Sequence, residues 1–70
     1  MDMIKVTSSA IEEIGYNELT QEMRVKFHKN PVTYSFCGVP KHIFYSFLNA
    51  PSKGTFYDVY IKGRYRCPGF

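Results

Sequence analysis

The sequence lacks long apolar runs, and it is relatively poor in charged residues. No stretch approaches the ~20 apolar residues of a membrane-spanning helix, and the start, Met1–Lys5, is too short and mixed for a signal peptide. Repeats, low-complexity tracts and linkers are also absent. With 44% hydrophobic and 21% charged residues, the chain is predicted to fold as a single domain over residues 1–70, with a core in about 6–65 and no membrane contact.

Groups that catalyse reactions or bind metals are scarce. The two histidines, His28 and His42, have no obvious partner and are predicted to lie on the surface. The cysteines and histidines lack the paired spacing of a zinc site, and one glycine, Gly54, does not make a phosphate-binding loop. We therefore expect a protein that is not an enzyme and that uses no metal or other cofactor.

Only two cysteines are present, Cys37 and Cys67. Without a signal peptide, the sequence predicts a cytoplasmic protein with reduced thiols. Cys37 is predicted to be a buried, unreactive thiol, because nothing in the sequence around it suggests a depressed pKa. A disulfide between the two cysteines stays open as the alternative.

Aromatic residues, in contrast, are abundant, with six tyrosines and six phenylalanines. Each buried ring removes a large area from water, which helps a domain too small for an extensive core. The net charge is +3 and the pI is about 9.0. This mildly basic balance is compatible with nucleic acid or an acidic partner, but it does not single either out.

Two segments, 23–28 and 32–37, alternate as half-buried strands do. Their apolar positions are Met23, Val25 and Phe27 in the first, and Val32, Tyr34 and Phe36 in the second. A turn at 29–31 separates them, so an antiparallel hairpin with one aromatic face is predicted. Tyr34 and Phe36 are expected to serve as core rather than as a platform for stacking bases.

Residues 10–16 allow two interpretations. Ile14 and Tyr16 favour a strand, whereas Ser9 followed by Glu12 resembles a capping box at the start of a short helix. The strand is preferred, and the polar residues 17–22 that follow have the length of a hairpin loop.

The period changes after Pro40, which suits the first turn of a helix. In residues 41–50 the apolar side chains follow a helical stripe that should cover the sheet. Residues 52–62 are ambiguous: β-favouring types predict a strand, whereas Ser52 as an N-cap and the spacing of Phe56 and Tyr60 favour a helix.

The order of several short patterns resembles the KTSC domain. The patterns are Val6-x-Ser8-Ser9-x-Ile11, Ile14-Gly15-Tyr16-Asn17, Met23-Arg24-Val25-x-Phe27, Tyr34-x-Phe36-x-x-Val39-Pro40, Ala50-x-Ser52-x-Gly54-x-Phe56 and Ile61-x-x-x-Tyr65. No single one is specific, but the ordered series is. The family's central Tyr-x-Tyr is Tyr34-x-Phe36 here, and the family often has Phe-Asn in the last segment, where this chain has Tyr57-Asp58.

The resemblance implies an α+β fold, with a small three-stranded antiparallel sheet and two helices packed on one face, in β-β-β-α-α order. It favours a helix over residues 52–62 against local propensity. KTSC domains occur at the C-terminus of some lysyl-tRNA synthetases and as stand-alone proteins of bacteria and phages. The family is taken to lack a known enzymatic activity, and RNA binding has been suggested for it.

The candidate binding residues are cations and one aromatic that could contact phosphates and bases. They are Arg24, Lys26, Lys62, Arg64, Tyr65 and Arg66. The first hypothesis is a non-catalytic module that binds RNA or another nucleic acid. The alternative is a protein-interaction module, such as a phage-encoded modulator of a host factor, which would use an exposed edge strand or the apolar tail ending in Phe70 and would also be able to form a homodimer.

Overall fold

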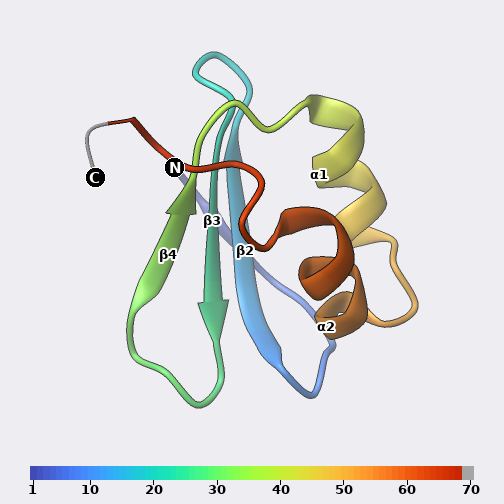
Figure 1. Ribbon diagram of the computed structural model, residues 1–70. Coiled ribbons are helices and arrows are strands. Elements are labelled where there is room, and N and C mark those ends of the chain that lie inside the picture. The colour runs from blue at the N-terminus through green and yellow to red at the C-terminus, as the bar shows by residue number, and fades with distance from the viewer. Residues whose placement is uncertain (69–70) are drawn as a thin grey trace.

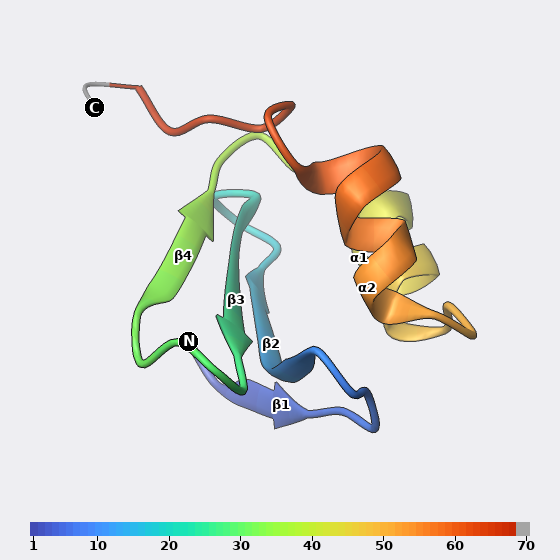
Figure 2. The same cartoon turned by 60° about the horizontal axis from the view of Figure 1, so that its bottom comes forward.

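A four-stranded antiparallel sheet carries helices on one of its faces in the computed structural model, which describes residues 1–68 (Figure 1). The strands are β1 (Met3–Lys5), β2 (Ile11–Asn17), β3 (Glu22–Phe27) and β4 (Thr33–Phe36), and they lie in sequence order across the sheet. The helices are α1 (Lys41–Leu48) and α2 (Lys53–Phe56), which continues into the π-helix η1 (Tyr57–Ile61). Both helical segments lie on the same side of the sheet (Figure 2).

The α+β class and the two helices on one face are confirmed, but the three-stranded sheet is wrong. Residues expected to form a lead-in make β1, in which Met3 is paired with Gly15 of β2. The sequence of β1 does not alternate between apolar and polar residues, and in the structure the neighbouring residues Ile4 and Lys5 are both exposed. The chain at β1 packs closely over Gly15, since a Cβ there would lie 2.6 Å from Met3 Sδ and 3.2 Å from the Asp2 carbonyl oxygen.

The three predicted strands are present as β2, β3 and β4. The helical alternative for residues 10–16 is wrong, because the capping hydroxyl belongs to a turn: Ser8 Oγ accepts hydrogen bonds from the backbone N–H groups of Ala10 and Ile11, both at 3.2 Å. These bonds turn the chain into β2. In the β3–β4 hairpin, Val25 lies opposite Tyr34, as the alternation requires.

The core lies between the sheet and the helices. Its buried side chains are Ile11, Ile14, Met23, Val25, Phe36, Val39, Phe44, Phe47 and Ile61. Tyr16 of β2 stacks on Phe44 of α1 with 4.5 Å between ring centroids, and its hydroxyl donates a 2.6 Å hydrogen bond to the Val39 carbonyl. Burial raises the pKa of Tyr16.

The second helix forms against its local propensity, as the resemblance implied. Phe56 stacks on Phe47 of α1 at 5.4 Å, and Ile61 is fully buried, so tertiary packing outweighs the β-favouring residue types. The π-turn is closed by the Lys62 N–H, which donates to the Tyr57 carbonyl at 2.9 Å. Ser52 occupies the N-cap position, but its hydroxyl donates to Thr55 Oγ1 instead of capping the backbone.

The outer strand of the β3–β4 hairpin is more exposed than the alternating pattern predicted, since that pattern placed Val32, Tyr34 and Phe36 on a buried face. Phe36 is buried in the core, but Tyr34 is 40% exposed and Val32, which precedes β4, is 53% exposed. Because β4 is an edge strand, it is only partly covered: at its C-terminal end the Phe36 ring lies 5.8 Å from that of Tyr57 in η1. One side of the Tyr34 ring therefore contacts Phe27, with 5.7 Å between the ring centroids. The rest of the ring is open to solvent.

Candidate functional site

The C-terminal basic segment, residues 62–66, follows η1 and runs towards the end of β4 (Figure 2). Lys62, Arg64 and Arg66 are all exposed. Within residues 1–68 none of the three forms an ion pair with a carboxylate. Arg64 Nε donates to the Val59 carbonyl at 3.2 Å, which orients the side chain without neutralising it. Among the described residues, the segment therefore presents three positive charges without a carboxylate partner.

Tyr65 in the middle of this segment has a different position. Its side chain is half-buried and packs against the core, and its carbonyl accepts a 3.0 Å hydrogen bond from the Cys37 N–H. Both contacts attach the segment to the end of β4. These contacts position the segment, the flanking arginines stay exposed, and a stacking role for Tyr65 stays a prediction.

The expectation of reduced thiols is wrong. Cys37, just after β4, and Cys67 are joined in a disulfide with 4.7 Å between their Cα atoms. Both are half-buried, so the predicted inert, free thiol of Cys37 does not exist. The bond holds the residue after Arg66 at the sheet. It also removes the reduced thiols as support for a cytoplasmic location, which stays a prediction.

Arg24 and Lys26 lie elsewhere, on the sheet face opposite the helices. Arg24 Nε pairs with Glu22 Oε2 at 3.1 Å, and Lys26 Nζ pairs with Glu12 Oε2 at 3.3 Å. The hydrogen bond and charge of Lys26 lower the pKa of Glu12. These two cations are therefore largely compensated, and the structure does not bring them together with the C-terminal basic segment.

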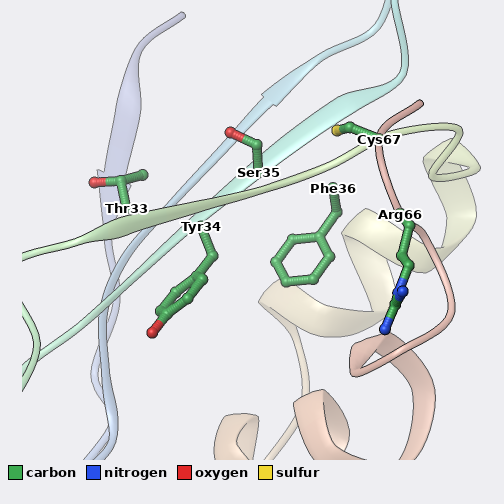
Figure 3. A pocket seen from close by; sticks show the side chains of 6 residues that line it. All are labelled: Thr33, Tyr34, Ser35, Phe36, Arg66 and Cys67. Atoms are coloured by element: carbon green, nitrogen blue, oxygen red, sulfur yellow. The ribbon is translucent and has the colours of Figure 1, made fainter. Parts of the chain in front are cut away.

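A groove of about 450 Å³ runs along β4. It is lined by Thr33, Tyr34, Ser35, Phe36, Arg66 and Cys67. Tyr34, Phe36 and Arg66 extend to the same side, with Phe36 between the other two, whereas Thr33 and Ser35 extend to the other side of the strand (Figure 3). We call this the β4 groove. It joins aromatic surface to one of the uncompensated cations.

Sequence reasoning did not place Arg66 beside Tyr34 and Phe36, which are 30 or more residues away. One signal was available. Cys37 follows Phe36 directly and Cys67 follows Arg66 directly, so a disulfide between them places the two preceding residues side by side. The resemblance carried no information about either cysteine, because neither belongs to the quoted patterns.

The backbone of β4 is unpaired along its outer edge. The His28 N–H donates to the Ala10 carbonyl, so the even-numbered residues of β3 bond towards β2 and the odd-numbered ones towards β4. The β4 partners of Met23 and Val25 are Phe36 and Tyr34. The N–H and C=O groups of Thr33 and Ser35 consequently point away from the sheet. Within residues 1–68 no backbone partner bonds to them.

A second groove, of about 350 Å³, brings together two segments from the resemblance. Its lining includes Ser8, Ser9, Ser52 and Gly54. Several of these groups stabilise the fold. Ser8 closes the turn before β2, and a Cβ on Gly54 would lie 3.5 Å from that of Ala10. The residues of the KTSC-like patterns in this groove therefore fix the loop before β2 and the start of α2.

The two histidines line neither groove. A ring nitrogen of His28 lies 2.9 Å from the Ser8 carbonyl oxygen, and His42 is exposed on α1. In the described part of the chain, no three histidine, cysteine or acidic side chains lie close enough to hold a metal ion. Over the same residues, no helix is long and apolar enough to cross a bilayer.

Comparison with known proteins agrees with the fold. The family model described as the KTSC domain matches residues 7–65. The chain belongs to the KTSC family. A KTSC domain protein from Yersinia pestis, known from a crystal structure, is 36% identical and superposes with a TM-score of 0.88, covering 94% of this chain and 92% of that one.

Two relatives show the KTSC domain in different settings. A lysine–tRNA ligase of Nostoc punctiforme is 31% identical over 64 residues, which are 91% of this chain but 11% of the ligase. The chain thus spans about a tenth of that relative's length. A protein of Tsukamurella paurometabola is 38% identical over 64 residues, which make up 91% of this chain and 94% of that protein.

Proposed function

We propose that this KTSC domain is a non-catalytic module that binds RNA through the C-terminal basic segment. The observation that carries the proposal is the set of three exposed cations, Lys62, Arg64 and Arg66, that lack carboxylate partners within residues 1–68. Cations that are free of protein carboxylates can neutralise phosphates and release counterions, which dominates affinity for nucleic acids.

The attachment of the segment supports the same proposal. Tyr65 and Cys67 fix the backbone on both sides of Arg66 to the end of β4. Because the backbone is already ordered, less conformational entropy is lost when the arginines engage a phosphate chain. The half-exposed ring of Tyr34 in the adjacent groove offers a surface on which an unpaired base can stack.

The family setting adds support of a different kind. Related sequences form part of lysine–tRNA ligases, whose name specifies a tRNA substrate. A basic module attached to such an enzyme would add RNA contacts. Phosphate contacts carry little sequence information, so we expect this domain to bind tRNA and single-stranded RNA with similar affinity.

The test is a titration of the disulfide-bonded protein with a tRNA transcript and with a single-stranded oligouridylate at several salt concentrations. We expect binding at low salt that weakens as salt rises, and each phosphate contact should contribute about 0.7 to the slope of log K against log salt for single strands. Arg64→Gln should lower both the affinity and the slope.

Arg24→Gln is the matched control, because it removes one positive charge from an ion pair on the opposite sheet face. It should change RNA affinity much less than Arg64→Gln. Equal losses for the two variants would show that net charge, and not the C-terminal basic segment, drives binding. Absence of binding at about 50 mM salt, where phosphate contacts are strongest, would contradict the proposal.

A further inference from the structure

We infer that the β4 groove is a docking site for an extended acidic peptide segment, which adds to the sheet as a fifth strand beside β4. The inference concerns the strand edge: it shares Arg66 and Tyr34 with the proposed RNA surface, but it does not use Lys62 or Arg64. Three features carry it: free backbone groups, an apolar floor and an unneutralised cation at one end.

The backbone groups make the edge competent to pair. Thr33 and Ser35 direct their N–H and C=O groups away from β3, as the register and the bonds of the neighbouring strands require. An exposed edge of this kind is a template for another strand. Main-chain hydrogen bonds then supply affinity, and alternate side chains supply specificity.

The β4 edge is four residues long, but it lacks the charged residues and prolines that usually prevent such pairing. Residues 31–40 contain no charged side chain, and Pro31 and Pro40 lie outside the strand itself. The other edge of the sheet, β1, is only three residues long and ends in exposed Lys5. Short and charged edges resist pairing, so β4 is the edge suited to a partner.

The side chains specify the partner's chemistry. Tyr34 and Phe36 lie two residues apart and point to the same side as Arg66 (Figure 3). In an antiparallel fifth strand, an apolar residue would pack across Tyr34, and the residue two positions earlier in the peptide would lie near Phe36 and Arg66. A carboxylate there can form a charge-assisted hydrogen bond with the guanidinium. The recognised pattern is acidic-x-apolar.

Charge favours such a peptide over a second copy of this chain. Residues 32–37 have no carboxylate to offer Arg66. Pairing two β4 edges would also bring together two chains that each carry a net charge of +3. An acidic peptide offers a carboxylate to Arg66, and its charge is opposite to that of this chain, which also speeds its encounter with the groove.

The test begins with selection from a displayed library of random linear octapeptides by the disulfide-bonded, full-length protein. We expect enrichment of acidic-x-apolar peptides. A synthetic peptide of the enriched sequence is then titrated against variants. Arg66→Gln should weaken binding about tenfold, because it removes the charged hydrogen-bond partner of the carboxylate. Lys62→Gln and Arg64→Gln should change peptide affinity little, although they are expected to weaken RNA binding.

Ser35→Pro and Ser35→Ala form the matched pair for the edge. Proline removes the outward N–H of residue 35 and leaves the β3 ladder intact, a position that edge strands tolerate, whereas alanine keeps that N–H. We expect loss of peptide binding for Ser35→Pro and unchanged binding for Ser35→Ala. A circular dichroism melt of each variant checks that it folds.

Three outcomes would overturn the inference. These are a lack of enrichment, equal peptide binding by Ser35→Pro and the unaltered protein, and a concentration-dependent dimer that Ser35→Pro abolishes. The last outcome would assign the edge to a second copy of the chain. RNA binding can succeed or fail independently, since Arg64→Gln tests it without altering β4.

Discussion

At the scale of single residues, two glycines illustrate how neighbouring strands and loops set local requirements. Gly15 is buried under β1, where a Cβ would lie 2.6 Å from Met3 Sδ and 3.2 Å from the Asp2 carbonyl oxygen. Gly54 belongs to the first turn of α2, where a Cβ would make only an ordinary contact with Ala10. Both lie in the patterns shared with the KTSC family, but only at position 15 does the surrounding structure leave no free room for a side chain.

We therefore expect Gly15→Ala and Gly54→Ala to have opposite effects on stability. Gly15→Ala should lower the free energy of unfolding by about 1 kcal/mol, because the added methyl group crowds the Asp2 carbonyl oxygen and forces the Met3 side chain to move. Gly54→Ala should raise it by about 0.4–1 kcal/mol, since alanine restricts the unfolded chain and suits a helix. Urea denaturation followed by circular dichroism measures both. A stable Gly15→Ala protein would show that β1 adjusts freely.

At the scale of elements, α1 stabilises the structure on both of its sides. Phe44 stacks on Tyr16 of the sheet, while Phe47 is fully buried and stacks on Phe56 of α2. The second helix contains strand-favouring residues, and it obtains its conformation from these contacts. The aromatic-rich composition thus becomes a chain of ring contacts that links sheet, first helix and second helix.

Phe47→Leu tests this dependence. The smaller side chain should leave a gap at Phe56 and lower the free energy of unfolding by about 1–2 kcal/mol. Hydrogen exchange of amides in α2 and η1 should accelerate more than that in β3. Ser46→Ala, an exposed change on the same helix, should stay within about 0.5 kcal/mol of the unaltered protein. Uniform acceleration across β3 and α2 would instead mean that the domain opens only as a whole.

At the scale of the whole molecule, the disulfide links residues separated by 30 positions and closes the chain from the sheet through both helices. A domain of 70 residues has a small core, so a cross-link is a large part of its stability. The same bond positions Arg66 beside β4. Stability and the arrangement of the β4 groove are therefore coupled in one covalent link.

Replacing both cysteines, Cys37→Ser with Cys67→Ser, should lower the free energy of unfolding by about 3–4 kcal/mol, from the entropy of closing a loop of this length. Adding dithiothreitol should destabilise the unaltered protein to a similar extent and leave the double variant unchanged. Thermal melts with and without the reductant measure both effects. An unaltered protein that is insensitive to the reductant would contradict a stabilising role for the bond.

Much of the fold could be predicted because its signals are local. The alternation of Met23, Val25 and Phe27 and the helical stripe after Pro40 depend on near neighbours along the chain, and both correspond to elements of the structure. The short strand β1 escaped prediction because its three residues show no alternation. Its place is set by Gly15, a partner ten or more residues away.

The sequence by itself determined the hairpins, the first helix and the basic character of residues 62–66, because period, proline placement and charge are properties of neighbouring residues. Tertiary structure decided which cations are free. It paired Lys26 of β3 with Glu12 of β2, turned Tyr65 towards the core, joined Cys37 to Cys67 and so placed Arg66 beside Tyr34. Those outcomes depend on which distant segments meet, and a single sequence does not encode that in any local pattern.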